Sequence, residues 1–150
     1  MAGLNSINAR CKLIEKVRLL DINNITFIDP VKKLQVQSVI ELFDACYIGW
    51  HKKSLYRYGI AANKIPEYMY SATPVIHSFS GQGDFIQQAQ SGITVEAENP
   101  QAIADAILQL YSLSESEREN MGIRGKEFVL ENLTYEKLTL KLEEALFKGK

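Results

Sequence analysis

The residues with the clearest potential for chemistry lie in the segment 58–76, YGIAANKIPEYMYSATPVI, which leads from a glycine through a helix start into a short apolar strand. Pro66 has no backbone N–H and cannot lie deep inside a helix, so the helix must begin close to it, near residues 62–65. The free N–H groups of such a start favour an anion, and Lys64 adds a positive charge. Glu67 follows, where a carboxylate can accept two hydrogen bonds from a ribose diol. Together these groups suggest a sugar nucleotide.

Each of these residues also has a purely structural interpretation. Glu67 favours a helix N-terminus whether or not a ligand binds, and Lys64 then is a solvated side chain. Arg57 could reach a diphosphate or be a solvated loop residue, and His51 could act on a proton or have no such role. The aromatic residues of the region could stack on a base or pack beneath the loop; they are Trp50, Tyr56, Tyr58, Tyr68 and Tyr70.

Short apolar runs that alternate with amphipathic helices must position these residues. The runs expected to form strands are ITFI (25–28), ACYIGW (45–50), TPVIHSF (73–79) and GITVEA (92–97). ACYIGW is apolar throughout, which is typical of a strand buried on both faces. KKLQVQSVIELF (32–43) predicts an amphipathic helix between the first two runs. The pattern predicts an α/β fold, a Rossmann-like three-layer domain whose parallel sheet of about four strands is covered by helices on both faces.

Only helices are expected after residue 113. SESE at 114–117 fits a capping box, and Thr134 is placed to cap a final helix. That helix carries an apolar stripe that needs a surface to cover, and an exposed stripe invites self-association. We therefore expect one domain over 1–150, with an α/β part at 1–113 and C-terminal helices at 114–150.

Ligands of open α/β sheets bind outside the carboxyl ends of the strands, so the loops after the strands are the place for a site. One of these loops, SFSGQGD at 78–84, has two glycines before Asp84. They suit either a close backbone approach to a ligand or a tight turn. The motif is neither a dinucleotide-binding GxGxxG nor a phosphate-binding P-loop.

Composition excludes several classes of function. The chain has 150 residues, a formal net charge of −1 and a pI near 6.1, without the clustered Lys and Arg of a nucleic-acid binder. It has neither an apolar run of about 20 residues nor a signal-peptide pattern, so we expect a cytoplasmic protein. Cys11 and Cys46 lack CxxC spacing and are expected as reduced, buried thiols. With only His51 and His77, far apart in the sequence, no metal site is expected.

Several motifs in the same order resemble the C-terminal, donor-binding domain of glycosyltransferase family 4, the group 1 retaining transferases with two Rossmann-like (GT-B) domains. NNITFIDPV is similar to the family's NVxFLGxV, and YGIAANKIPEYMYSATPVI to its E-x7-E region followed by EAMASGxPVI. The branch with YGxSPNKLxEYMAxGxPVI is closer still. NPQAIADAILQL is similar to DPExLAxAIxxLL, and MGIRGKEFVLENLTYEKLTLKLEE to MGxxGRxxVxExFSWExxxxKLxE.

The resemblance assigns a role to each matching residue. Glu67 takes the place of the second glutamate of E-x7-E, which holds the nucleotide ribose. The backbone amides of Ile60 and Ala61 would meet the distal phosphate, and Asn63 and Lys64 match the NK of the closer branch. The loop that borders the base corresponds to Asp29, Pro30 and Val31, and Arg57 is a further candidate for the diphosphate.

The chain departs from the family pattern at three positions. Gly59 stands where most members carry the first glutamate, so the usual carboxylate contact to the donor sugar cannot be transferred. Ala72 stands at the glycine of ASG, and Asp29 at the glycine of the base loop. We expect that either of these two replacements could narrow the pocket.

The implied activity is metal-independent, retaining transfer of a sugar from a nucleotide diphosphate, with a UDP-sugar as the first expectation and no cofactor. The acceptor would be a glycan or a lipid-linked hydroxyl in bacterial surface polysaccharide synthesis. We expect it to be held by an N-terminal domain outside this sequence. The resemblance implies that the chain begins about two strands into the donor domain, so we expect a fragment that is inactive alone and, in the full-length protein, could lie at the inner face of the membrane. The catalytic residues are unassigned. The alternative is a non-catalytic Rossmann-like module that pairs with another chain.

Overall fold

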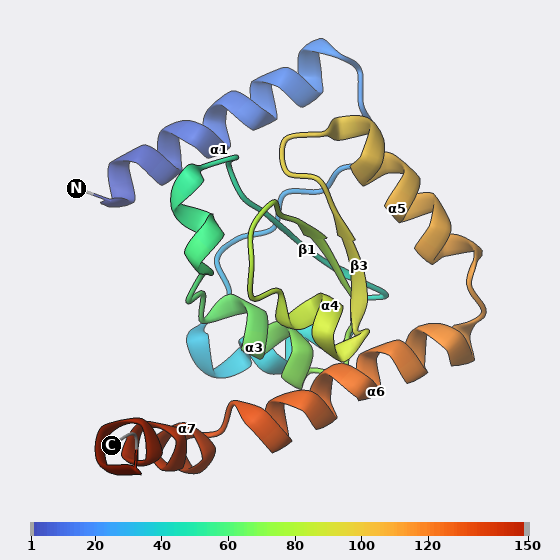
Figure 1. Cartoon of the computed structure of the whole chain (residues 1–150). Coiled ribbons are helices and arrows are strands. Elements are labelled where there is room, and N and C mark those ends of the chain that lie inside the picture. Colours follow the sequence, from blue (N-terminus) through green and yellow to red (C-terminus); the bar gives the residue numbers. More distant parts are fainter. Residues whose placement is uncertain (1, 149–150) are drawn as a thin grey trace. The chain divides into compact units, whose positions relative to one another are not determined.

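A computed structural model describes residues 2–148, with side chains for residues 9–147 (Figure 1). The chain forms two compact units, 1–33 and 34–150, and each is described by itself. The helices and strands are α1 Ala2–Leu19, α2 Val36–Ile40, β1 Cys46–Gly49, α3 Lys64–Tyr70, β2 Val75–Ser78, α4 Phe85–Ala89, β3 Gly92–Val95, α5 Pro100–Ser112, α6 Glu115–Asn132 and α7 Tyr135–Glu143. Single turns of helix are η1 Lys33–Gln35, η2 Ser54–Tyr58 and η3 Glu144–Lys148. The predicted α/β alternation is confirmed from β1 to α5.

The N-terminal unit contains α1 and an irregular segment in place of the strand expected at residues 25–28. These residues form neither helix nor strand, and the side chains of Ile25 and Ile28 are 48% and 57% exposed. The segment 25–28 would be the third strand of a doubly wound sheet of order 3-2-1-4-5-6. In that order the third strand lies beside the second and not beside the fourth. Residues 2–148 supply no such neighbour for the segment, and a strand is not stable without one. The prediction of four strands is therefore wrong by one.

The helix expected at 32–43 is also shorter than predicted. Regular α-helix is confined to the five residues of α2, and only Ile40 in it is buried. The apolar side chains of Leu34 and Leu42 in this segment are 97% and 81% exposed. The apolar spacing alone therefore overestimated the length of this helix.

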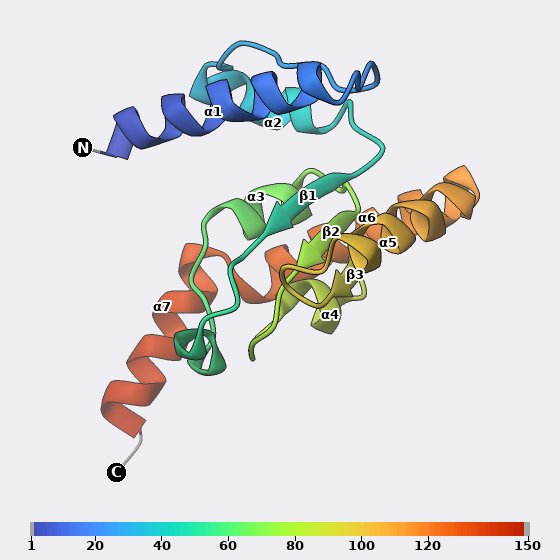
Figure 2. The ribbon, with the colours of Figure 1, turned by 90° about the horizontal axis from the view of Figure 1, so that it is seen from above.

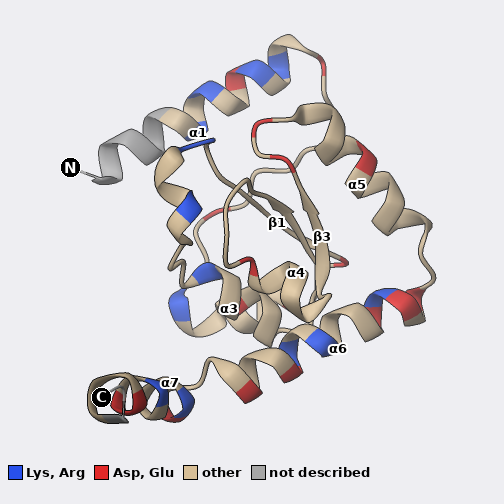
Figure 3. Ribbon diagram, viewed as in Figure 1, with Lys and Arg blue, Asp and Glu red and all other residues tan. Residues whose placement is uncertain are grey.

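The sheet of the second unit consists of three parallel strands in the order β1-β2-β3. The strands lie side by side, and α3, α4, α5 and α6 surround them (Figure 2). The strands carry no Lys, Arg, Asp or Glu, whereas residues of both signs occur along α6 (Figure 3). Within the described residues, no helix is both long enough and apolar enough to cross a membrane.

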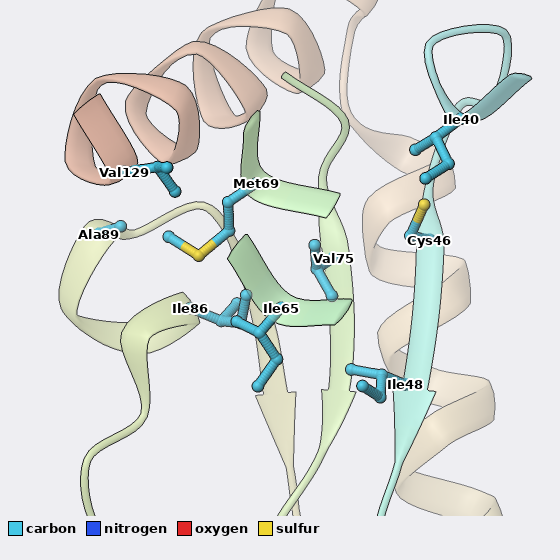
Figure 4. Close-up of a cluster of buried hydrophobic side chains, with 9 residues drawn as sticks. All are labelled: Ile40, Cys46, Ile48, Ile65, Met69, Val75, Ile86, Ala89 and Val129. Carbon is cyan, nitrogen blue, oxygen red and sulfur yellow. The ribbon is translucent and has the colours of Figure 1, made fainter. Parts of the chain in front are cut away.

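The main hydrophobic core lies on the face of the sheet that α3, α4 and α6 cover. Cys46, Ile48 and Val75 of the strands meet side chains from these helices there (Figure 4). The members contributed from outside the sheet are Ile40, Ile65, Met69, Ile86, Ala89 and Val129. Met69, Val75 and Ile86 are fully buried, so this layer holds α3 and α4 firmly against the strands.

The opposite face is covered only in part. Ile76 packs there against Ala106 and Leu110 of α5. Tyr47 of β1 lies on the same face beyond α5 and is 52% exposed. The prediction that β1 is buried on both faces is therefore wrong, because α5 covers β2 and β3 but leaves the outer strand open.

The C-terminal helices begin where the sequence predicts. Ser114 and Glu117 form the expected capping box of α6, and the Thr134 hydroxyl accepts a hydrogen bond from the backbone N–H of Lys137 in α7. No side chain of α7 is buried, and Leu142 is 60% exposed. The apolar stripe of this helix is thus uncovered within the described residues.

Candidate functional site

The loops that follow the three strands start at one edge of the sheet. Gly49, Ser78 and Val95 are register partners across β1, β2 and β3, so the chain leaves the strands side by side. This carboxyl edge is where open α/β sheets bind ligands. The candidate site is therefore built from the loops 50–63 and 79–84.

The helix start predicted from Pro66 is present. α3 begins at Lys64, and its residues Ile65 and Met69 are 3% and 0% exposed because they face the sheet. Lys64 and Glu67 lie on the exposed side of the helix. A hydrophobic anchor on one side of α3 thus presents an ammonium and a carboxylate to solvent on the other.

Gly59 gives the turn before α3 its shape. Its φ of 91° and ψ of 176° fall in a region that is open almost only to glycine. Within residues 2–148, the backbone N–H groups of Ile60 and Ala61 donate no hydrogen bond. Asn63 occupies the N-cap position, and its side chain makes no capping bond. The N–H groups of Ile60 and Ala61 thus have no acceptor among the atoms that the structure describes.

The turn at Gly59 is joined to the loop 79–84. The carbonyl oxygen of Tyr56 accepts hydrogen bonds from the N–H of Gly59 at 3.0 Å and from the N–H of Gln82 at 3.2 Å. Gly83 has a φ of 73°, and a Cβ added there would lie 3.8 Å from the Cα of Gly59. The two glycine-containing loops therefore form one continuous surface.

The Arg57 side chain lies over its neighbour Tyr58. Its Nη2 donates to the Tyr58 hydroxyl at 2.7 Å, and the guanidinium carbon lies 4.7 Å from the centre of the ring. Both residues are exposed. The pair holds a positive charge close to the turn, and contact between Arg57 and a diphosphate stays a prediction.

Two polar side-chain contacts connect the loop after β1 with the loop after β3. Nδ1 of His51 lies 2.8 Å from a carboxylate oxygen of Glu98, and Lys52 donates to Glu96 at 2.5 Å. The hydrogen bonds from these partners lower the pKa of both glutamates. Within the described residues, no three His, Cys, Asp or Glu side chains converge as a metal site would require.

A buried polar network that the sequence did not predict lies beneath the loops. His77 of β2 is fully buried, and its Nδ1 lies 3.0 Å from Oδ1 of Asp84. The indole N–H of Trp50 donates to Nε2 of His77 at 3.0 Å, and the Thr94 hydroxyl donates to Asp84 at 2.5 Å. The available sequence signal was a histidine inside the apolar run TPVIHSF, seven residues before an aspartate that precedes a helix. Of the aromatic residues, Trp50 and Tyr56 pack beneath the loop, whereas Tyr58 is 75% exposed.

The predicted site residues fall into two groups. Arg57, Asn63, Lys64 and Glu67 lie with the Gly59 turn at the carboxyl edge of the sheet. Asp29, Pro30 and Val31 belong to the N-terminal unit, so their contact with a base stays a prediction. Ala72 is in neither group because it lies at the amino end of β2, away from the candidate site, with a φ of 56°. The expectation that Ala72 narrows the pocket is therefore wrong.

Comparison with known proteins identifies the family. The sequence model described as "Glycosyl transferases group 1" matches residues 2–113. The chain belongs to this family. Among solved structures, sucrose-phosphate synthase from Thermosynechococcus elongatus matches 95% of the chain with a TM-score of 0.74 and 20% sequence identity. A search of curated proteins gave no match.

These comparisons bear on the family and the fold. The predicted group 1 glycosyltransferase family and the Rossmann-like fold are both confirmed, with three strands in the sheet. The chain spans only 35% of the length of the synthase, so it corresponds to about a third of that protein. At 20% identity, this likeness concerns the fold and not the substrate.

Proposed function

We propose that this chain is the nucleotide-sugar binding part of a retaining glycosyltransferase. The observation that carries the proposal is the free N–H groups of Ile60 and Ala61, beside exposed Lys64 and Glu67, at the carboxyl edge of a group 1 transferase fold. Backbone donors and an ammonium suit a phosphate, and a carboxylate suits a ribose diol. A nucleotide diphosphate sugar carries both a phosphate and a ribose diol, and a UDP-sugar is our first candidate.

The proposed chemistry uses the turn to stabilise the leaving group. When the bond between the anomeric carbon and the diphosphate oxygen breaks, the bonding electrons stay on the diphosphate. The fixed N–H groups at Ile60 and Ala61 and the Lys64 ammonium would stabilise that charge without a metal ion. An acceptor hydroxyl supplies the oxygen of the new glycosidic bond, and its proton passes to the departing diphosphate.

The remaining parts of the proposal concern the whole enzyme. The acceptor is a glycan or a lipid-linked hydroxyl, held by a further domain, and the product belongs to bacterial surface polysaccharide or glycoconjugate synthesis. The enzyme works in the cytoplasm, at the inner face of the membrane where a lipid-linked acceptor is found. Support for this context comes from the resemblance to the NKLxEYM branch, whose motif residues Asn63, Lys64 and Glu67 are exposed together at the start of α3.

One observation favours a second candidate, a non-catalytic module that pairs with another chain. Gly59 replaces the first glutamate of the family motif, and its φ of 91° would strain any other L-residue there. The turn is thus built without the carboxylate that most members place against the donor sugar. A chain that binds neither nucleotides nor nucleotide sugars would fit this second candidate.

Titration of the ¹⁵N-labelled chain with UDP, GDP and UDP-sugars tests the proposal directly. We expect saturable shifts of the amide signals of Gly59 to Glu67 with one nucleotide. Glu67→Gln keeps the size of the side chain but removes the charge that accepts from the diol. A charged hydrogen bond contributes about 1.5–3 kcal/mol, so the dissociation constant should rise roughly 10- to 100-fold.

Glu127→Gln is the matched control, because Glu127 is an exposed glutamate on α6. It should leave nucleotide affinity unchanged. Equal weakening by both variants would show a general charge effect and contradict the assignment of Glu67. No shifts at millimolar nucleotide in the wild-type chain would favour the non-catalytic module.

A further inference from the structure

The strongest feature that the proposed donor contacts leave unexplained is the buried pair of His77 and Asp84. The side chain of His77 is 0% exposed and that of Asp84 is 6% exposed. Burying two titratable groups is costly unless they are fully hydrogen-bonded. An apolar pair would fill the same core space without that cost, so the network calls for an explanation other than packing.

The hydrogen-bond partners fix the tautomer of His77. The Trp50 indole nitrogen can only donate, so Nε2 of His77, 3.0 Å away, must be the acceptor. The ring proton is then on Nδ1, which donates to Oδ1 of Asp84 at 3.0 Å. The imidazole thus has one defined orientation, with Trp50 on one side and Asp84 on the other.

Asp84 links this pair to two further elements. Its carboxylate accepts from the Thr94 hydroxyl of β3 at 2.5 Å and from the backbone N–H groups of Ile86 and Gln87 in α4, at 3.0 and 3.4 Å. Burial raises the pKa of Asp84, but the hydrogen bonds from His77 and Thr94 outweigh it and hold the pKa below its usual value. Asp84 is therefore a charged acceptor that fixes the position of His77 relative to β3 and α4.

A closed circle of four aromatic side chains in contact connects His77 to the Gly59 turn. The His77 ring stacks on Phe79 with centres 4.9 Å apart, and Phe79 contacts Tyr56 at 6.1 Å. Tyr56 also meets the edge of Trp50 at 5.8 Å, which closes the circle. The carbonyl of Tyr56 is the acceptor for the N–H of Gly59 at 3.0 Å. A path of direct contacts therefore runs from Asp84 through His77, Trp50 and Tyr56 to the turn.

We propose that His77 and Asp84 are positioning residues for the turn 59–61, acting through the hydrogen bond to Trp50. They touch no part of a bound nucleotide. They set the place of Trp50, which holds Tyr56 and so the N–H groups of Ile60 and Ala61. The consequence for donor affinity rests on the proposed function, whereas the position of the turn can be measured in the free protein.

Two substitutions of His77 separate positioning from simple packing. The amide of His77→Gln reaches the place of Nε2 and offers an oxygen to the Trp50 indole. The amide of His77→Asn reaches only the place of Nδ1, so it keeps a donor for Asp84 and loses the acceptor for Trp50. Both remove the buried ring, so a role in packing alone predicts similar effects of the two variants.

The readouts are the indole N–H signal and the amide signals of residues 59–61 in ¹H–¹⁵N NMR spectra. The chain has one tryptophan, so the indole signal is unambiguous. We expect His77→Gln to keep the indole N–H protected from solvent exchange and the turn amides near their wild-type positions. His77→Asn should expose the indole N–H to exchange and shift the turn amides, with the amide of Val129 in the core unchanged.

Trp50→Phe provides a second test in case the His77 variants do not fold. It leaves His77 bonded to Asp84 and removes the indole donor, together with part of the aromatic ring. The turn amides should then shift as in His77→Asn. Unchanged turn amides in a folded Trp50→Phe or His77→Asn protein would overturn the proposal, as would identical spectra of His77→Gln and His77→Asn.

Titration with UDP then distinguishes this inference from the proposed function. If the wild-type chain binds UDP, Trp50→Phe should raise the dissociation constant about tenfold. If wild-type binds and the variant binds equally well with unmoved turn amides, the positioning role is wrong and the donor site stands. If wild-type does not bind UDP but the turn amides follow the Trp50 bond, the positioning role stands and the donor site is wrong.

Discussion

The amino and carboxyl edges of the sheet both depend on glycines, but for different reasons. At the amino edge, a Cβ on Gly122 of α6 would overlap the carbonyl oxygen of Ala72, and a Cβ on Gly92 would overlap that of Val75. At the carboxyl edge, the atom nearest to a Cβ on Gly59 would be 3.6 Å away, and the constraint is instead its positive φ. Space is limiting at one edge and backbone conformation at the other.

The difference follows from what covers each edge. α6 runs across the amino edge, where its Arg124 donates two hydrogen bonds to the Gln90 carbonyl, at 2.8 and 3.1 Å. At the Gly59 turn the loops are instead held from below by the network of His77 and Asp84. Close backbone packing therefore stabilises the amino edge, while a hydrogen-bonded network supports the carboxyl edge.

The largest effect on stability is expected for Gly122→Ala. Alanine is the better helix former by about 1 kcal/mol, but its Cβ cannot fit against the Ala72 carbonyl, so α6 must move away from the turn before β2. Overpacking costs about 1–3 kcal/mol and occasionally more, and because a backbone oxygen overlaps the added Cβ we expect a net loss of about 3 kcal/mol after the gain in helix propensity. Urea denaturation followed by circular dichroism measures the change.

Gly125→Ala, in the same helix, is the matched comparison. Its Cβ would meet the side chain of Ser91 at 2.9 Å rather than a backbone atom, so it should lose less stability than Gly122→Ala. An increase in stability for Gly122→Ala would show that helix propensity outweighs contact here and would remove the basis of the comparison between the edges.

A smaller loss of unfolding free energy, about 2 kcal/mol at neutral pH, is expected for Asp84→Asn. The asparagine amide turns a donor toward Thr94 or His77, each of which already donates to Asp84. Because the pKa of Asp84 is lowered in the folded chain, its carboxylate stabilises the fold above its ordinary value of 3.8 and less as the pH falls below it.

Denaturation of wild-type and Asp84→Asn between pH 7 and pH 3 tests both the loss of stability and its dependence on pH. The difference in unfolding free energy should be constant near neutral pH and shrink in acid. Asp105→Asn, on the exposed side of α5, is the control and should behave as wild-type. A difference that grows as the pH falls would mean that Asp84 is protonated in the native state.

Gly59→Ala should weaken nucleotide binding strongly while it lowers the stability of the fold only slightly. The strained backbone costs about 1 kcal/mol of stability, but relief of that strain moves the N–H groups of Ile60 and Ala61. We expect at least tenfold weaker binding of the nucleotide that the wild-type chain prefers, measured by NMR titration. Ala61→Gly keeps every N–H group and is expected to bind within about twofold of wild-type. If Gly59→Ala binds normally, the turn is not the phosphate site.

Local patterns predicted most of the fold, and their failures have physical causes. Pro66 fixed the start of α3, and Ser114 with Glu117 fixed that of α6, because these signals act within one turn of helix. The prediction of a strand at 25–28 was wrong because a strand is stable only beside a neighbour, and that neighbour is often far away in sequence. The prediction that β1 is buried on both faces was wrong at Tyr47 for a related reason. A run of apolar residues does not indicate how much of a sheet the helices cover.

The candidate site could be predicted only in part. The turn from Gly59 to Glu67 is continuous in sequence, so its residue types were sufficient to locate it. The support beneath it joins Trp50, His77 and Asp84 from three separate segments. Only the strand register brings these residues together, and no spacing along the chain encodes that contact.

The smallest effect is expected for the exposed pair of Lys52 and Glu96, which lies at the same edge as the buried network. Both side chains are more than half exposed, so solvent and salt screen their attraction. Lys52→Ala should therefore leave the denaturation midpoint unchanged at physiological salt, in contrast to Asp84→Asn. The hydrogen bond from Lys52 nevertheless lowers the pKa of Glu96, and the variant should raise that pKa toward its usual value in a carboxyl ¹³C NMR titration. A shifted midpoint would mean that surface pairs also support this edge, and the buried network would then no longer account for its stability alone.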